Sequence, residues 1–537
     1  MKTERPIVPR PTPDAAVLSA LEGVDPVTAR VFAARGVTTA SELDYGLARL
    51  APVSQLDNID DAVRLLLDKR ADRITVIGDF DVDGATSTAL VIRCLREYGF
   101  ADVDYLVPNR FEFGYGLTPE IVRIAAERNP ALLITVDNGV SSLDGVAEAA
   151  TFGIPVLVTD HHLPGPQLPE AEVILNPNLE DSRFPSRNLA GVGVAFYLMA
   201  ALGRQLEKAG NAGAAKVPSQ FLDLVALGTV ADVVPLDHNN RVLVEQGLRR
   251  IRAGKTVPGV DALLRQSGRQ LSRTVSTDLG FVVGPRINAA GRLDDISIGI
   301  ECLLTDDMGT AMHHAGILDR INGERREIES TMREQAFKYV DAMDVRNLPS
   351  CVCVYDEDWH QGVVGLIASR VKERMHRPAI AFARESDDRL KGSARSVAGV
   401  HARDLLEAVH AVRPECMTKF GGHAMAAGLS VPVSEYEAFV TTVSEQLDRL
   451  YPAADFSGAL VTDGALPDTA LNLGFARTLR DAGPWGSGFP EPLWNGDFSI
   501  VETRVVGEKH LKMRVRPAAS GPVMDAIAFN QAGPAYR

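Results

Sequence analysis

Gly78-Asp79-Phe80-Asp81-Val82-Asp83-Gly84 directly follows an apolar run from Ile74 to Ile77. A short run of this kind, rich in β-branched residues, predicts a buried strand. Alternate side chains of an extended chain lie on one side, so we expect Asp79, Asp81 and Asp83 to face one point. Neighbouring carboxylates repel one another, and a bound cation is the ordinary remedy. The segment therefore predicts a strand that ends in a metal site.

Two other interpretations of this acidic segment were weighed. Asp-x-Asp-x-Asp-Gly matches half of a calcium-binding EF-hand loop, but Leu90 stands at the twelfth position, where that loop needs a bidentate glutamate. The preceding segment also predicts a strand instead of a helix. A metal-free acidic turn is the second alternative.

The pattern of an apolar run followed by a polar turn and a helical stretch recurs up to Pro177. Further runs lie at Leu132–Val136, Val156–Val158 and Val173–Leu175. Apolar strands that alternate with helices predict an α/β domain with a parallel sheet covered on both faces, whose ligands gather beyond the carboxyl ends of the strands. One strand-end aspartate is usually a helix cap. Repetition at adjacent strands indicates a site instead, and the runs at 132–136 and 156–158 lead to Asp137-Asn138-Gly139 and Asp160-His161-His162.

The types of residue at these strand ends favour divalent cations that prefer oxygen. Successive side chains point opposite ways, so only one of His161 and His162 should reach a given metal directly. Asp232, which follows an apolar helical stretch from Phe221 to Val230, could add a carboxylate. Oxygen ligands with one imidazole suit Mn²⁺ or Mg²⁺ better than zinc. Six such ligands are too many for one ion and fit a pair about 4 Å apart that shares a carboxylate and activates water for phosphoryl hydrolysis.

Bulk composition sets the broad class. The chain has 537 residues, 45% hydrophobic and 23% charged, which predicts a globular protein of three or four domains. No apolar run spans a bilayer and no secretory signal starts the chain, so we expect a cytoplasmic protein with no membrane contact and five reduced cysteines. The net charge of −14 argues mildly against nucleic-acid binding, although basic clusters at 249–255 and 370–377 could override it.

Four further motifs narrow the interpretation. Asn109–Gly116, Gly284–Arg292, Lys391–Ser396 and Gly421-Gly422-His423 follow the acidic motifs in this order. Together the motifs resemble the DHH phosphoesterases and, more narrowly, the RecJ exonucleases, from about residue 40 to the last residue. The resemblance implies a 5′→3′ exonuclease that hydrolyses single-stranded DNA to nucleoside 5′-monophosphates in DNA repair and recombination. Neither the polarity nor the product follows from the residues alone.

The resemblance also implies residue roles at the metal site. Two divalent cations, Mn²⁺ or Mg²⁺, would be held by Asp79, Asp81, Asp83, Asp137, His161 and Asp232. Asp137 would bridge them, Asp160 would orient a histidine, and His162 would lie near the scissile phosphate. The chain departs from the wider superfamily at Ile77, because many members have a histidine at this position. Asp79 is expected to take the place of that histidine.

A second set of residues is expected to hold the DNA strand. The resemblance implies phosphate contacts from a DHH-associated domain, and a connecting helix that closes a cleft too narrow for a duplex. The candidates are Arg110, Tyr115, Arg286, Asn288, His360, Ser369, Arg370, Arg395, Ser396, Gly422 and His423. Ser369 and Arg370 could instead be plain surface positions on a helix, and Gly421-Gly422 a tight turn.

The segment after Pro452 alternates between apolar and polar residues and predicts a small β-domain. It resembles the oligonucleotide-binding barrel of RecJ proteins, which continue with further strands, so we expect an incomplete barrel. Trp485, Phe489 and Trp494 are candidates to stack on bases, with core packing as the alternative. The predicted divisions are an N-terminal helical region (1–70), a DHH catalytic domain (71–305), a connecting helix (306–345), a DHH-associated domain (346–450) and an OB-like domain (451–537).

Two rival functions were considered. A DHH phosphodiesterase that acts on short oligonucleotides or cyclic dinucleotides would generally be shorter and lack the terminal barrel. A non-catalytic DNA-binding scaffold would have lost acidic positions, and here all are filled. The expected partners are single-stranded DNA, a single-strand-binding protein and a helicase, and the expected state is a monomer.

Overall fold

The computed structural model describes residues 5–107, 116–344, 348–518 and 521–532. These residues form two compact units: one runs from Gly46 to Gly458, and the other combines the residues up to Tyr45 with those from Ala459 onward. The expected N-terminal region of residues 1–70 is therefore not a unit of its own. Its first part joins the C-terminal unit because strand β1 (Ile7–Pro9) pairs in parallel with β12 (Leu460–Thr462). Strand pairing between distant segments left no local signal in the sequence.

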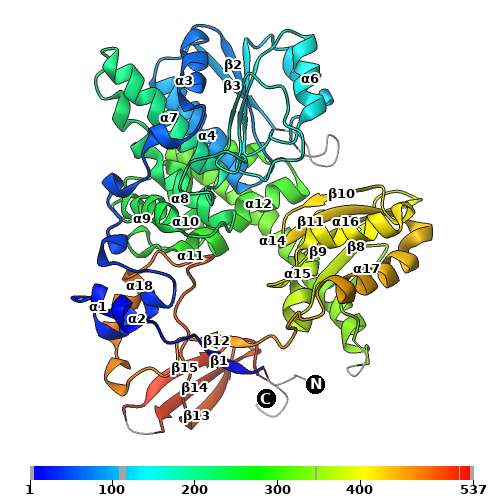
Figure 1. Ribbon diagram of the computed structural model, residues 1–537. Helices are drawn as coiled ribbons and strands as arrows, with labels where there is room; N and C mark the ends of the chain where they lie inside the picture. The colour runs from blue at the N-terminus through cyan, green and yellow to red at the C-terminus, as the bar shows by residue number, and fades with distance from the viewer. Residues whose placement is uncertain (1–4, 108–115, 345–347, 519–520, 533–537) are drawn as a thin grey trace. The chain divides into compact units, whose positions relative to one another are not determined.

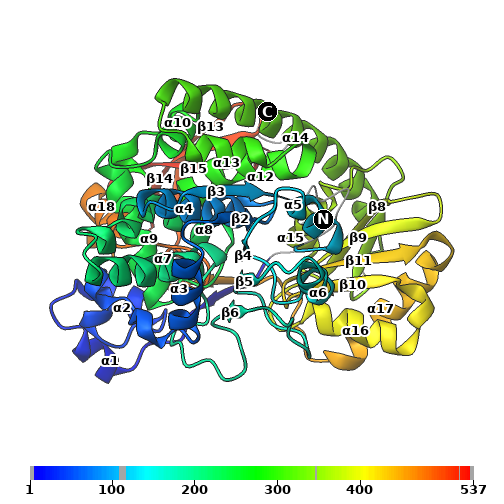
Figure 2. The same ribbon diagram turned by 90° about the horizontal axis from the view of Figure 1, so that it is seen from above.

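The first half of the larger unit is built around a parallel five-stranded sheet with the order β3-β2-β4-β5-β6. Its strands are β2 (Arg73–Ile77), β3 (Asp102–Leu106), β4 (Leu132–Val136), β5 (Val156–Thr159) and β6 (Val173–Leu175). Helices α5 (Pro119–Ala126) and α6 (Leu143–Thr151) cover one face, while α4 (Val82–Glu97) and α7 (Gly191–Lys208) cover the other (Figures 1 and 2). The central strands are buried on both faces, which explains why they are apolar without alternation. The predicted parallel α/β sheet is confirmed.

A helical layer follows the sheet and leads to one long helix. Its members are α8 (Leu222–Ala231), α9 (His238–Arg252), α10 (Pro258–Gln266), α11 (Ser276–Asp278), α12 (Gly284–Leu293) and α13 (Ser297–Leu304), with α3 (Ile59–Asp68) earlier in the chain. A π-helical turn (Leu279–Val283) runs directly into α12. The predicted connecting helix is α14 (Met308–Asp341), which Asp307 caps by accepting a hydrogen bond from the Thr310 N–H.

The second half of the larger unit contains a mixed five-stranded sheet with the order β10-β11-β9-β8-β7. Its elements are β7 (Val352–Tyr355), α15 (Val364–Met375), β8 (Ala379–Arg384), β9 (Arg389–Arg395), α16 (Ala402–Val412), β10 (Lys419–Gly422), β11 (Ala426–Pro432) and α17 (Tyr436–Leu450). Alternate residues of β8 pack on opposite sides: Ala381 lies in the cluster under α14 and α15, and Phe382 in the cluster with α16 and α17. The expected second α/β domain is confirmed.

The smaller unit carries a three-stranded antiparallel sheet of β13 (Phe498–Val506), β14 (His510–Pro517) and β15 (Met524–Ala528). Helices α1 (Ala15–Ala20), α2 (Pro26–Ala33) and α18 (Leu473–Asp481) belong to the same unit. Trp485 and Phe489 are buried and stack on Phe32, so these aromatics form core, which was the alternative to base stacking. Across the described residues of both units, every helix is too short or too polar to cross a membrane.

Candidate metal centre

The strand order brings the two main acidic motifs to one edge of the sheet. The chain runs from β2 outward to β3 and then returns to β4 on the other side of β2. Asp79 follows β2 and Asp137 follows β4, so both lie where the strand order reverses. Such a reversal opens a crevice beyond the carboxyl ends of the strands.

The three aspartates of the first motif converge by a different route from the one predicted. Helix α4 begins at Val82, and Asp81 is its N-cap, accepting hydrogen bonds from the N–H groups of Asp83 (2.9 Å) and Gly84 (3.1 Å). Asp83 therefore lies in the first turn of a helix, and the expectation of one extended chain through all three residues was wrong. Ligand atoms of Asp79, Asp81 and Asp137 still lie within 4.8 Å of one another.

Asp83 belongs to a second group on the other side of Asp137. Its carboxylate accepts hydrogen bonds from the N–H groups of Gly191 (2.6 Å) and Val192 (2.9 Å), at the start of α7. The positive end of a helix dipole favours a carboxylate in this position. Asp83 groups with His161 and with Asp232, which caps the C-terminus of α8.

Asp137 belongs to the group with Asp79 and Asp81, contacts His161 of the second group, and is held in an unusual backbone conformation. Its φ of 62° is left-handed, which is rare for a residue other than glycine and is found at functional sites. Gly191 allows the close approach of α7, because a Cβ on Gly191 would lie 2.6 Å from the Asp137 Cβ. Strand end and helix start are thereby packed against each other with no room for a side chain between them.

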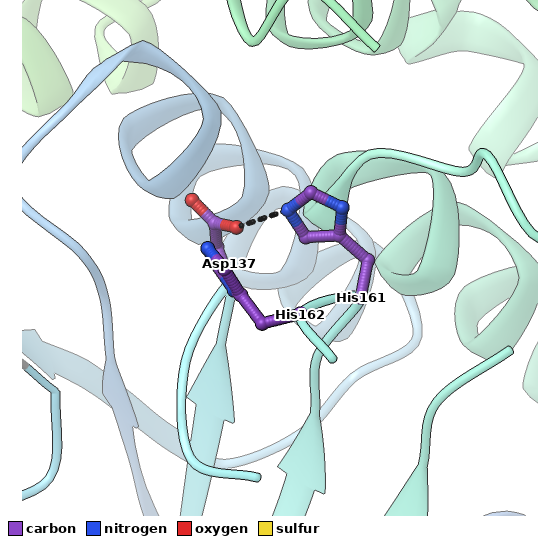
Figure 3. A group of neighbouring side chains, drawn as sticks. All are labelled: Asp137, His161 and His162. Carbon is purple, nitrogen blue, oxygen red and sulfur yellow. Dashed lines mark ion pairs between the residues drawn. The ribbon is translucent and has the colours of Figure 1, made fainter. Parts of the chain in front are cut away.

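His161 completes the cluster and His162 does not share its position. His161 Nε2 lies 3.1 Å from Asp137 Oδ1 and 3.5 Å from Asp232 Oδ2. Figure 3 shows the His161 imidazole pointing at the Asp137 carboxylate from the end of the neighbouring strand. Ligand atoms of Asp137, His161 and His162 also lie within 4.8 Å of one another, so the expectation that only one of the two histidines reaches a given metal directly stays a prediction.

Asp160 fixes His162 instead of joining the cluster. One of its oxygens accepts a hydrogen bond from Val140 N–H (2.9 Å), and the other lies 2.7 Å from His162 Nδ1. Burial opposes ionisation of Asp160, but the hydrogen bonds from His162 and the charges of His162 and His161 together outweigh it and lower the pKa to about 2. Burial also opposes the charged form of His162, yet Asp160 raises its pKa to about 9. His162 in turn stacks on His423, with ring centroids 5.0 Å apart.

The buried carboxylates of the cluster would be stabilised in their charged form by added positive charge. Burial, followed by the repulsion of Asp83, raises the pKa of Asp137 well above its ordinary value. Burial and the Asp232 charge raise the pKa of Asp83 and of Asp81. Burial lowers the pKa of His161, which keeps its imidazole neutral and able to act as a ligand. Carboxylates with one neutral imidazole are the donor set of Mn²⁺ or Mg²⁺, so the residues fit these cations.

Seven of the eleven predicted strand-binding residues fall into three groups. Arg286, Asn288 and Arg370 line one cavity of about 660 Å³, and Asn288 Oδ1 also accepts a hydrogen bond from Val82 N–H at 3.2 Å. Gly422 and His423 lie near the metal centre through the His162 contact. Arg110 and Tyr115 lie outside the described residues.

The other four candidates have local partners. His360 Nδ1 accepts from Gly362 N–H (3.1 Å), the Ser369 hydroxyl donates to the Gly365 carbonyl (3.1 Å), and Arg395 donates to the Ser393 hydroxyl (2.9 Å). Ser396 is only 1% exposed and donates to the Val400 carbonyl at 2.7 Å. This leaves Ser396 little surface for a phosphate, while the other three remain predictions.

Sequence reasoning missed much of the cavity around Arg286. Its described lining also includes Arg269, Arg292, Arg325, Arg326 and Arg333. Three of these arginines belong to α14, which the sequence indicated only as a connecting helix. Their spacing along one helical stretch was the available signal, but charged residues on a helix are more often a solvated face. The cavity gives an acidic protein a local basic surface.

Comparison with known proteins places this geometry in a family. Sequence models match the DHH family N-terminal domain at residues 73–229, the DHHA1 domain at 348–449 and the RecJ OB domain at 462–536. The single-stranded-DNA-specific exonuclease RecJ of Salmonella typhimurium is 50% identical over 99% of this chain and 93% of its own length. The Escherichia coli RecJ is 50% identical over 94% of this chain and 89% of its own length.

A solved structure agrees with the sequence relatives. The crystal structure of Thermus thermophilus RecJ in complex with Mn²⁺ superimposes with a TM-score of 0.81 at 31% identity, covering 99% of this chain and 75% of that chain. The three domain matches along the chain and the identity over nearly its full length support the same family. The chain belongs to the RecJ family of single-stranded-DNA-specific exonucleases.

Proposed function

We propose that this protein removes nucleotides from the 5′ end of single-stranded DNA and releases nucleoside 5′-monophosphates, using two divalent cations, Mn²⁺ or Mg²⁺. As a RecJ family member it is a phosphodiester hydrolase specific for single-stranded DNA. The observation that carries the proposal is the convergence of buried carboxylates whose pKa values are raised by burial and by repulsion from one another.

The grouping of ligand atoms supports Asp137 as the shared ligand. Asp137 lies within 4.8 Å of Asp79 and Asp81 on one side, and of His161 on the other. His161 in turn belongs to the group with Asp83 and Asp232. The proposed cation ligands are Asp79, Asp81, Asp83, Asp137, His161 and Asp232. When bound, a cation pair supplies the charge that activates water and neutralises the reacting phosphate.

The remaining residues of the centre would position the substrate. Asp160 holds His162 by Nδ1, which leaves Nε2 as the ring nitrogen able to meet a phosphate oxygen. His423 stacks on that ring from the second sheet, so a phosphate beside His162 would also lie near Gly422 and His423. Phosphate contacts are further proposed for Arg286, Asn288, Arg370, His360, Ser369 and Arg395.

The cellular setting of the activity belongs to the same proposal. We infer a cytoplasmic monomer that acts in DNA repair and recombination beside a single-strand-binding protein and a helicase. The proposed functional divisions are 71–305 for catalysis, 346–450 for substrate binding and the OB-like part for guiding the strand. A RecJ OB match at residues 462–536 favours a long DNA strand over short oligonucleotides or cyclic dinucleotides.

Digestion of single-stranded DNA labelled separately at each end tests the proposal. With Mn²⁺ present, the 5′ label should appear at once as a mononucleotide, and the 3′ label only at the end of digestion. Asp137→Ala should be nearly inactive because both cation positions lose a ligand. Early release of the 3′ label would overturn the polarity, and an active Asp137→Ala variant would overturn the shared-ligand role.

A further inference from the structure

The arginine-lined cavity contains one acidic residue, and that residue is buried. Glu329 of α14 is the only carboxylate among the described lining residues, where seven are arginines. Its side chain is 8% exposed. A single carboxylate would repel a phosphate and weaken its binding, unless the carboxylate holds the surrounding arginines in place.

Glu329 is bonded to arginines from two different elements. One oxygen accepts from Arg370 Nε of α15 at 3.0 Å, and the other accepts from Arg325 Nη1 of its own helix at 2.5 Å. Arg325 is itself held by Asn322, whose Oδ1 lies 2.9 Å from Arg325 Nη2. Both oxygens of Glu329 are therefore used, and Arg370 keeps its Nη groups for other acceptors, among them Glu373.

The same helix carries a second acidic residue with a matching contact. Asp319 Oδ1 accepts from Arg286 Nε at 2.9 Å, and Arg286 Nη1 donates to the Val282 carbonyl at 2.6 Å. Arg286 comes from α12, before the connecting helix, whereas Arg370 comes from α15, after it. One helix thus holds a predicted strand-binding arginine from each half of the larger unit.

We propose that Asp319 and Glu329 are positioning residues, which hold Arg286 and Arg370 in the orientation that grips the phosphates of the DNA strand. An arginine side chain loses rotamer entropy when it is fixed, and a carboxylate on Nε fixes it before the substrate arrives. Both arginines are then fixed in the lining of the cavity. The proposal rests on the proposed strand contacts of these two arginines, and it makes α14 part of the binding surface instead of a mere connection.

A structural role for Glu329 is the competing explanation, because the same contacts tie α14 to α15. The two explanations differ in how the substitutions combine. A residue that acts through Arg370 has no further effect once Arg370 is removed, whereas a residue that holds two helices together still has one. They also differ in kinetics, because positioning for binding raises KM without lowering kcat.

The experiment measures KM, kcat and Tm for Glu329→Gln, Arg370→Ala and the double variant on 5′-labelled single-stranded DNA with Mn²⁺. Loss of a charge-assisted contact predicts a KM about tenfold higher for Glu329→Gln, with kcat within about twofold of the wild type. The double variant should match Arg370→Ala alone. Glu373→Gln is the matched control, because Glu373 contacts the same arginine from an exposed position, and its KM should be unchanged.

A wild-type KM in Glu329→Gln, or additive effects in the double variant, would overturn the positioning role. An unchanged KM in Arg370→Ala would refute the contact between Arg370 and the DNA strand. The positioning role of Glu329 would then be refuted too, but the proposed exonuclease activity would not. Asp319→Asn with Arg286→Ala repeats the cycle at the other end of α14. This second cycle decides the question if Glu329→Gln does not fold.

Discussion

Asp137 Oδ1 lies 3.1 Å from His161 Nε2, although the two residues follow different strands of the sheet. The contact joins two groups of ligand atoms into one centre, with Asp79 and Asp81 on one side and Asp232 on the other. A carboxylate shared in this way can serve two cations at once. Substitution of Asp137 should therefore reduce activity more than substitution of a residue that binds only one of the two cations.

Cation binding should depend on pH in a defined direction. The raised pKa values of Asp83 and Asp137 mean that the cation-free fold keeps protons that an unfolded chain loses near pH 3.8. Without cations, stability should thus fall as pH rises through the folded pKa values, because ionisation becomes more favourable in the unfolded chain. Cations displace these protons, so the increase in Tm caused by Mn²⁺ should grow as the pH rises above 3.8. Thermal unfolding with and without Mn²⁺ measures this, and a pH-independent increase would contradict it.

The two adjacent histidines should separate metal binding from substrate positioning. His161→Ala removes a ligand and should weaken Mn²⁺ binding about 10- to 100-fold. His162→Ala should bind Mn²⁺ almost normally but lose about 100- to 10,000-fold in kcat, the range for a group that assists at the reacting phosphate. Calorimetric titration of Mn²⁺ and steady-state kinetics test the pair. Equal loss of metal binding in both variants would refute the assignment.

Gly191→Ala should damage the metal centre through backbone packing. The new Cβ would lie 2.6 Å from the Asp137 Cβ, so Asp137 or the start of α7 must move. We expect the free energy of unfolding to fall by about 1–3 kcal/mol. Activity should fall by more than the fraction of unfolded protein accounts for. Gly316→Ala in α14 is the control, because its Cβ would enter open space and helix propensity predicts a gain of roughly 0.5–1 kcal/mol. Full activity in Gly191→Ala at saturating Mn²⁺ would contradict the prediction.

The smaller unit should depend on one buried ion pair. Arg35 Nη1 lies 2.6 Å from Asp463 Oδ1, and the side chains are only 1% and 4% exposed. Arg35→Ala leaves the Asp463 charge without its main partner and should cost about 3–5 kcal/mol. The exposed pair Arg480–Asp481 is the control, and Arg480→Ala should cost less than about 1 kcal/mol. Fluorescence of Trp485 and Trp494 in a Trp359→Phe background follows this unit alone.

The same ion pair should make the stability of the smaller unit depend on pH in the acid range. Burial opposes ionisation of Asp463, but the hydrogen bonds from Arg35 and the Leu493 N–H, with the charges of Arg35 and Arg10, together outweigh it and lower the pKa below 3.8. The stabilisation is complete above that pH and should be lost as pH falls through the lowered pKa. Arg35→Ala should therefore remove much of the acid dependence of the tryptophan signal. An unchanged acid transition in the variant would show that other groups set it.

The amino-acid sequence alone was enough to predict the α/β class and the strand ends that carry the acidic residues, while the metal ligands stay a prediction. Strands at Ile74–Ile77 and Leu132–Val136 were predictable because central parallel strands are buried on both faces and need continuous apolar residues. The predicted ligands rest on aspartates that recur after such strands and on the resemblance to the DHH phosphoesterases. The long connecting helix was equally predictable from its periodic charges, at α14 (Met308–Asp341).

Only the tertiary structure decided how these parts meet. Asp83 turned out to lie in a helix, held by the N–H groups that begin α7 more than a hundred residues later. The N-terminal strand joined β12 at the other end of the chain, and Trp485 went into the core with Phe32. The contact between Glu329 and Arg370 likewise depends on the packing of α14 against α15. The physical reason is common to all: local pattern fixes which face of an element is buried, whereas the partner on that face is chosen by packing between segments remote in sequence.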